Sequence, residues 1–188
     1  MSLLTNPTTS RRRLLIAWIP TMAWVLVIAC ESTGTFTGAR TMIWTHRLLS
    51  LFSDHVSLNV VEILNHVLRK TGHFFGYATL SWFFFRGWTE TLAYRHERLL
   101  VKLGRPITAR RWHLRAAVLA VLCTFVIASL DEFHQTYLPG RTGVFHDVVL
   151  DTMGGVFAQT LLLLYWTKRK LIKTPAEPAS KLEALSAK

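Results

Sequence analysis

Four apolar stretches, separated by segments that carry most of the charge, constrain this 188-residue chain more than any other feature. They cover roughly residues 14–30, 74–85, 116–130 and 152–166. Of all residues 51% are hydrophobic and 18% are charged, and the mean hydropathy is +0.28. This balance argues against a disordered chain and, with only two cysteines, against a small disulfide-rich secreted protein. We therefore predict an all-α fold, a four-transmembrane-helix bundle.

The basic residues are distributed unevenly among the segments that join these stretches. Seventeen of the 22 Lys and Arg residues lie before the first stretch, between the second and third, or after the fourth. Since an excess of Lys and Arg marks cytoplasmic segments, we predict a multi-pass inner-membrane protein with both termini in the cytoplasm. The net charge of +11 then reflects topology, so we expect no nucleic-acid partner. A cleaved signal peptide is the alternative for residues 14–30, but three further apolar stretches favour an uncleaved anchor.

The chain is expected to form one transmembrane domain, residues 14–170, between a basic cytoplasmic N-terminus, 1–13, and a disordered cytoplasmic tail, 171–188. The first outer connection, about residues 31–66, is long. Apolar residues recur in it at helical spacing from Trp44 to Leu64, which predicts an amphipathic helix on the outer bilayer surface between the first two spans. A cap packed over the bundle is the alternative.

The charge-free runs are short for membrane spans. Fifteen residues separate Arg115 from Asp131, which is ~22 Å of helix, less than the ~30 Å of hydrocarbon in a bilayer. Long Arg and Lys side chains at the inner ends reach the interface, but short Asp and His side chains at the outer ends do not. We therefore expect the outer-end polar groups to lie below the membrane surface.

Helical spacing predicts that these outer-end groups converge. Lys70, His73 and Tyr77 are three and four residues apart, which places them near one stripe of a helix. Gly154 and Gly155 on the last stretch allow a neighbouring helix to come close. The candidate catalytic residues are His73, Asp131, Glu132, His134, Asp147 and Asp151. The candidate ligand-binding residues are Arg69, Lys70, Tyr77, Gln135 and Arg141.

Two blocks carry a family resemblance. Residues 69–80, RKTGHFFGYATL, have a basic pair followed by His, Phe and Tyr, and residues 129–143, SLDEFHQTYLPGRTG, have Asp-Glu, Gln and Pro-Gly-Arg. In both blocks the chain resembles the VanZ-like membrane proteins. It departs from many of them at Asp151, where Asn is more usual. The resemblance implies a role at the cell envelope and in glycopeptide susceptibility, because the family is named for a protein associated with low-level teicoplanin resistance.

The residues themselves favour a site for an anionic lipid or a lipid-linked cell-wall precursor, near the outer face of the membrane. Arg and Lys side chains there suit a phosphate, and His73 or His134 suits proton transfer. Membrane lipids are therefore the expected partners. An ion- or proton-coupled transporter and a purely structural charge network are the alternatives.

Whether the chain is an enzyme stays open at this point. Arg141, His146 and Asp151 resemble the Arg, His, Asp order of integral-membrane lipid phosphatases, but with different spacing. The acids Glu132, Asp147 and Asp151 offer oxygen ligands to a metal ion, yet no compact metal-binding motif is present. We therefore assign no metal ligand, leave any cofactor unknown, and leave the oligomeric state open.

Overall fold

A computed structural model describes residues 7–33, 38–52, 57–105, 113–138 and 143–173. These residues form five helices and no strand, which confirms the all-α prediction. The helices, in chain order, are α1 (Pro7–Glu31), α2 (Gly38–Ser50), α3 (Leu58–Lys102), α4 (His113–Gln135) and α5 (Phe145–Lys173). Helix α5 continues three residues past the expected domain boundary at 170, so residues 171–173 of the expected tail are helical.

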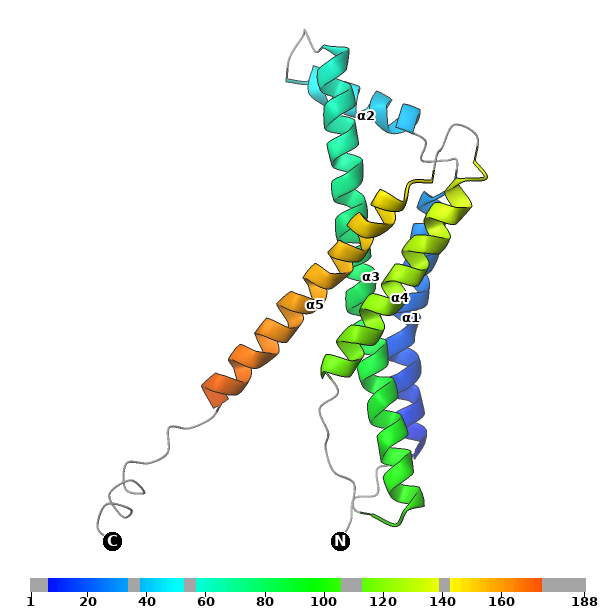
Figure 1. The fold of residues 1–188 in the computed structure, drawn as a ribbon, viewed down its shortest axis with the longest axis vertical. Coiled ribbons are helices and arrows are strands. Elements are labelled where there is room, and N and C mark those ends of the chain that lie inside the picture. The colour runs from blue at the N-terminus through cyan, green and yellow to red at the C-terminus, as the bar shows by residue number, and fades with distance from the viewer. Residues whose placement is uncertain (1–6, 34–37, 53–56, 106–112, 139–142, 174–188) are drawn as a thin grey trace, which may run out of the picture.

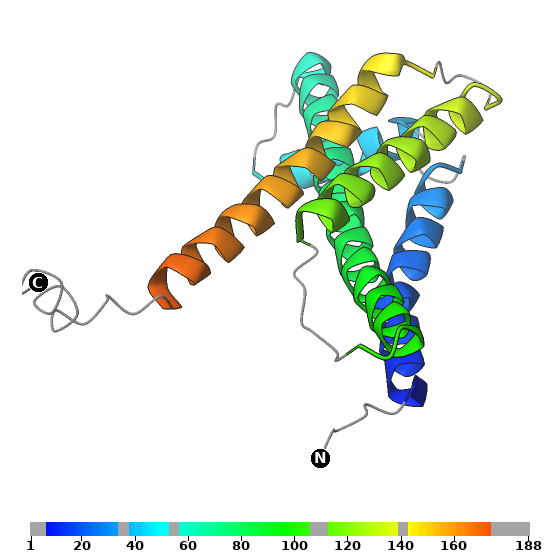
Figure 2. The same ribbon diagram turned by 60° about the horizontal axis from the view of Figure 1, so that its bottom comes forward.

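Helix α3 is the centre of the arrangement. It has 45 residues, which corresponds to ~68 Å, and it packs against each of the other four helices. Figure 1 shows α1 and α4 beside the half of α3 that lies away from α2, while α5 crosses α3 obliquely and α2 lies across the other end. Figure 2 shows from another side that α5 and α1 extend in different directions. We call the two ends of the bundle the α2 end and the opposite end.

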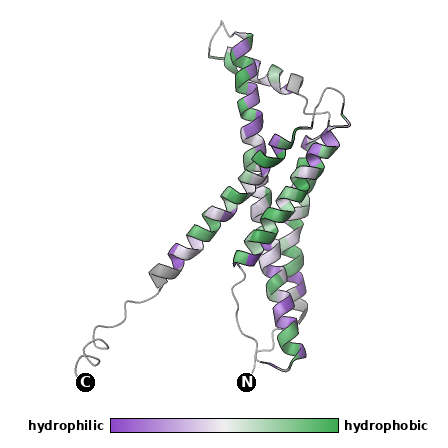
Figure 3. Cartoon of the chain, in the orientation of Figure 1, coloured by the Kyte–Doolittle hydropathy of each residue, from purple (hydrophilic) through white to green (hydrophobic). Residues whose placement is uncertain are grey.

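Three of the helices are long and apolar enough to cross a membrane: Arg11–Glu31, His113–Gln135 and Phe145–Arg169, among the described residues. The long α3, which contains the predicted span 74–85, does not meet this criterion. Hydrophilic residues alternate with apolar ones toward both of its ends, as Figure 3 shows. Its middle contains Tyr77 and Ser81, which are buried against other helices. The predicted four-span bundle thus has three helices that qualify by length and composition.

The expected amphipathic connection is divided between two helices. α2 carries the exposed apolar residues Ile43, Trp44 and Leu48, and its buried Thr45 packs toward Asn65 of α3, with 3.4 Å between Oγ1 and Oδ1. A new helix begins after Ser57, whose side chain accepts a hydrogen bond from the Val60 N–H at the start of α3. The apolar pattern predicted from Trp44 to Leu64 therefore begins in α2 and continues after Ser57 in α3. Val56, which belongs to this pattern, lies outside the described residues.

Small residues allow the other helices to approach α3 closely. Residues Ala116, Ala120, Thr124 and Ala128 are four apart on one face of α4 and are all fully buried. On α5, a side chain at Gly154 would collide with the backbone carbonyl of Phe74. The expectation that Gly154 permits a close helix is confirmed.

Two tryptophans attach α1 to α3. The Trp18 indole N–H donates to Thr91 Oγ1 at 3.0 Å, and the Trp24 indole N–H donates to the carbonyl oxygen of Gly76 at 2.9 Å. The ring of Trp18 also lies against Gly87, where an added Cβ would come within 2.8 Å of it. α1 is therefore held in register with α3 by polar bonds as well as by apolar packing.

We predict that Gly154→Ala destabilises the protein. The new methyl group would collide with backbone atoms of α3, and these cannot move aside as a flexible side chain could. Overpacking of this kind costs about 1–3 kcal/mol of unfolding free energy. The measurement is the melting temperature of the purified protein in detergent. Gly72→Ala is the matched control, because nothing lies within 4 Å of its added Cβ. Equal melting temperatures for the two variants would contradict the close contact of α3 and α5.

Candidate functional site

Polar side chains from three helices meet at the α2 end of the bundle. α3 brings four of them on three successive turns, and α4 and α5 bring carboxylates close to them. We call this group the polar cluster. Its members are Arg69, Lys70, His73, Tyr77, Asp131, Glu132, Gln135, Asp147 and Asp151.

Each of the three successive turns of α3 meets a different carboxylate. Lys70 Nζ lies 3.0 Å from Asp147 Oδ1, with both side chains about one-third exposed. One turn further along α3, His73 Nδ1 lies 3.5 Å from Asp151 Oδ2. The predicted convergence of these groups is therefore present, and the carboxylate of the second pair is buried while that of the first is not.

The third turn is the most enclosed. Tyr77 is 1% exposed, and its hydroxyl donates to Asp131 Oδ2 at 3.1 Å. Gln135 Nε2 donates to the same carboxylate oxygen, also at 3.1 Å. The Tyr77 and His73 rings stack at 6.3 Å between centroids, so the second and third turns are physically coupled.

Glu132 of α4 reaches the start of α5 with one of its carboxylate oxygens. Its Oε2 accepts a hydrogen bond from the Val144 N–H at 3.0 Å, directly before Phe145 begins the helix. A carboxylate at this position is stabilised by the unpaired amide groups and positive dipole of a helix N-terminus. The Glu132 side chain is buried and has this structural partner already.

Asp151 is the unusual member of the cluster. Its side chain is completely buried, and neither carboxylate oxygen has a hydrogen-bond partner among the described residues. A buried carboxylate without partners is costly in free energy. The nearest basic group is the His73 imidazole, at 3.5 Å, beyond good hydrogen-bond geometry. Asp151 therefore has unused hydrogen-bonding capacity inside the protein.

Two cavities border His73, and the smaller of them reaches the Asp151 carboxylate. The first, which we call the charged cavity, has a volume of about 90 Å³ and lies among α3, α4 and α5; Arg69, His73 and Asp151 line it, together with His66 and Lys70. The second, which we call the groove, has about 450 Å³ and lies among α1, α2 and α3. Arg69 and His73 line both, so they form the boundary between the two spaces.

The groove combines an apolar wall with a polar end. Trp24, Phe75, Gly72 and Gly76 line it, and Glu31 and Arg69 are its charged residues. No atom lies within 4 Å of a Cβ added at Gly72 or Gly76, so neither glycine is required for helix packing. Their missing side chains leave space in the groove instead.

Some candidate residues lie elsewhere. His134 is exposed, and its Nδ1 lies 3.5 Å from the Oγ of Ser32, the residue directly after α1, so it takes no part in the polar cluster. His146 is also exposed, 3.9 Å from Asp147. Arg141 lies outside the described residues. Within the described ranges no group of three His, Cys, Asp or Glu residues is placed to hold a metal ion.

Sequence reasoning missed the groove and the contribution of His66 to the charged cavity. A signal for the groove is present in the sequence. Arg69, Gly72, His73 and Gly76 occupy positions i, i+3, i+4 and i+7, one face of a helix. Gly72 and Gly76 share that face with Arg69 and His73. They differ in this from Gly154 on α5, which contacts the backbone of a neighbouring helix.

We predict that Tyr77→Phe lowers the unfolding free energy by about 1 kcal/mol, because it removes one hydrogen bond to Asp131 from the interior. Tyr137→Phe is the control: Tyr137 is 70% exposed, and its ring contact with Phe133 does not need the hydroxyl. Thermal unfolding in detergent compares the two. If Tyr77→Phe is no less stable than Tyr137→Phe, the contact with Asp131 adds nothing to the fold.

Comparison with known proteins identifies the family. The sequence model of the VanZ/LLP1 family matches residues 16–167, a range that contains the whole polar cluster and both cavities. Neither a curated protein nor a solved structure gives a significant match. The match confirms the resemblance carried by the two blocks at residues 69–80 and 129–143, and with the three apolar helices it indicates a membrane protein. The chain belongs to the VanZ/LLP1 family.

Proposed function

We propose that this protein spans the inner membrane four times and binds an anionic lipid, or a lipid-linked cell-envelope precursor, at the polar cluster near the outer face. In this arrangement the α2 end faces outward and both termini are cytoplasmic. The distribution of basic residues supports the orientation, since most Lys and Arg residues lie in segments at the opposite end.

α3 serves as the fourth span in this proposal. Arg69 and Arg86 are 17 residue steps apart, which corresponds to ~25 Å of helix. α3 packs against α1, α4 and α5. A helix that neighbours cover on several sides does not need a strongly apolar sequence, because little of it meets lipid. The low hydropathy of α3 is therefore compatible with a membrane-spanning position.

The observation that carries the proposal is that Arg69 and His73 separate a small charged cavity from a larger groove. Arg69 makes no ion pair within the part of the chain that the structure describes. A guanidinium group offers a planar set of donors that suits a phosphate. A phosphate at Arg69 would lie beside the charged cavity, and its hydrocarbon chain would follow the groove past Gly72 and Gly76.

Proton transfer is the chemistry that the cluster best supports if the lipid is processed. The His73 imidazole lies between Arg69 and the buried Asp151, and the Asp151 carboxylate has no other partner among the described residues. A carboxylate beside the imidazole orients the ring and stabilises its protonated form. Tyr77 and Gln135 hold Asp131 in place and serve the geometry of the cluster. Asp147 takes part by fixing Lys70.

Transport is less well supported. Below Tyr77 the polar line along α3 continues only to Ser81, which is bonded to Gln159 of α5. Phe84 and Phe85 then pack against Ala116 and Ala117 in the apolar core. A pathway for ions requires polar groups across the full thickness of the membrane, and these residues interrupt it.

The first prediction concerns topology. In a background without Cys30 and Cys123, Ser50→Cys should react with a membrane-impermeant maleimide on intact cells, and Leu99→Cys only after permeabilisation. Both positions are exposed, on α2 and on the far part of α3. If both react from the same side, α3 does not cross the membrane and the proposed four-span arrangement is wrong.

The second prediction concerns the ligand. Arg69→Gln should weaken binding of a polyprenyl monophosphate to the purified full-length protein by about tenfold, the loss of one charge-assisted interaction. Gly72→Leu should also weaken it, because the new side chain fills the groove. Gly72→Leu should leave the binding of glycerol phosphate, which has no hydrocarbon chain, unchanged.

Two variants serve as controls for this measurement. Arg47→Gln removes an exposed arginine on α2 that lines neither cavity, and Thr71→Leu adds an apolar side chain next to Gly72 but outside the groove. Both should bind the polyprenyl phosphate normally. Normal binding by Arg69→Gln and Gly72→Leu would leave the polar cluster with a structural role only. In cells, we expect the same two variants to alter glycopeptide susceptibility while remaining folded and inserted.

A further inference from the structure

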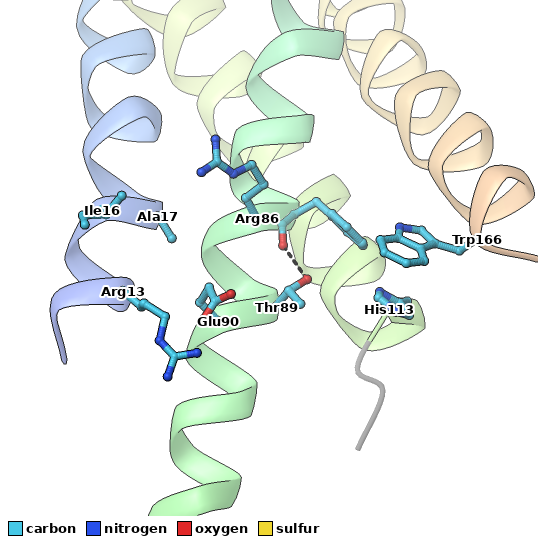
Figure 4. Close-up of a pocket in the computed structure, with 9 residues that line it drawn as sticks. Arg13, Ile16, Ala17, Arg86, Thr89, Glu90, His113 and Trp166 are labelled. Atoms are coloured by element: carbon cyan, nitrogen blue, oxygen red, sulfur yellow. Dashed lines mark hydrogen bonds between the residues drawn. The ribbon is translucent and has the colours of Figure 1, made fainter. Parts of the chain in front are cut away.

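A second polar pocket lies at the opposite end of the bundle, where α1, α3, α4 and α5 come together. It has a volume of about 310 Å³. Arg13 of α1, Arg86 and Glu90 of α3, His113 of α4 and Trp166 of α5 line it (Figure 4). We call it the basic pocket.

The two arginines of the pocket have no carboxylate of their own. Arg13 extends from α1 toward α3, and Arg86 extends from α3 toward α1 (Figure 4). Neither forms an ion pair with any described residue, and Glu90 forms none with them. Both arginines are exposed. A guanidinium group whose donors are free can share them with a phosphate. The pocket therefore presents one positive charge in excess of its single carboxylate.

Other arginines near this end do have a partner within the chain. Arg98 Nη1 donates to the Tyr94 hydroxyl at 3.1 Å. Hydrogen bonds from Arg11 and Arg98 lower the pKa of Tyr94 below its usual value. Among the described residues Arg13 and Arg86 have no hydroxyl or carboxylate partner of this kind, and Arg86 lies over the Trp82 ring, 6.0 Å from its centroid.

Aromatic rings from three helices form the wall of the pocket. The His113 ring stacks on Trp166 with 4.6 Å between centroids and on Phe85 with 6.0 Å. The planes are nearly parallel, at 18° and 19°. Because each ring belongs to a different helix, the stack fixes this end of α3, α4 and α5 and gives the pocket a preformed apolar side.

We propose that the basic pocket binds an anionic phospholipid of the cytoplasmic leaflet, with its phosphate between Arg13 and Arg86 and its glycerol and upper acyl carbons against the aromatic wall. Arginine donors match phosphate geometry, and basic pockets between membrane helices on the cytoplasmic side suit anionic head groups. The assignment to this leaflet rests on the proposed orientation. It does not depend on the outer polar cluster binding a ligand.

Glu90 allows the proposal to predict an increase in lipid affinity as well as a decrease. Its carboxylate lines the same pocket as the two arginines, so it repels a bound phosphate and limits its affinity. Removing the charge should strengthen binding of an anion. If the pocket instead held only a structural charge balance, Arg13→Gln and Arg86→Gln would leave the binding of phosphatidylglycerol unchanged.

The test is native mass spectrometry of the full-length protein in detergent, titrated with phosphatidylglycerol and, in parallel, with phosphatidylcholine. We expect phosphatidylglycerol to bind more tightly than phosphatidylcholine. Arg13→Gln and Arg86→Gln should each weaken the tightest phosphatidylglycerol site by about tenfold, as expected for the loss of a charged donor. Glu90→Gln should tighten that site, and it provides a result even if an arginine variant fails to fold.

Arg12→Gln is the matched control, because Arg12 is the exposed neighbour of Arg13 and does not line the pocket. It should bind phosphatidylglycerol as the unaltered protein does. Equal binding of the two lipids, no effect of either pocket arginine, or weaker binding by Glu90→Gln would each overturn the proposal. Failure of the outer ligand site would appear separately, in the polyprenyl phosphate measurement.

Discussion

The rest of the structure depends on the pairing of polar groups that α3 carries into the interior. Lys70, His73 and Tyr77 lie on successive turns, and each has a carboxylate from α4 or α5 beside it. Burial of such groups without partners costs several kcal/mol, so α4 and α5 cannot shift along α3 without breaking these contacts. The pairing sets the register of the helices, and the apolar surfaces that surround it set only their proximity.

Close contact between the helices is what allows short side chains to meet. Gly154 permits the α3 backbone to approach α5, and the alanine face of α4 permits the same on another side. Asp147 and Asp151 are short, so a wider separation of the helices would leave their oxygens out of reach of Lys70 and His73. The contacts between charged residues therefore depend on the small residues, because close packing brings the charged groups within reach of one another.

The two ends of the bundle use basic residues in different ways. At the α2 end, Lys70 has an internal partner, while Arg69 borders both a charged cavity and a groove. At the opposite end, Arg13 and Arg86 share a pocket with only one carboxylate. Both ends thus contain arginines with spare donors next to apolar walls, which is the combination that a phosphate-bearing lipid requires. The two proposals differ in the leaflet and can fail independently.

The sequence by itself determined the helical class, the membrane character, the family and most of the polar cluster, because hydropathy, charge distribution and residue spacing are local properties of a chain. It indicated that Lys70, His73 and Tyr77 share a stripe, and that Gly154 permits a close helix. Only the tertiary structure decided which carboxylate meets which partner, and that Glu132 binds the start of α5. It also decided that His134 turns toward Ser32 and that the glycines of α3 border a groove. These outcomes depend on the crossing of helices that are far apart in the chain. Helical spacing fixes the face on which a side chain lies, but not the neighbour that this face meets.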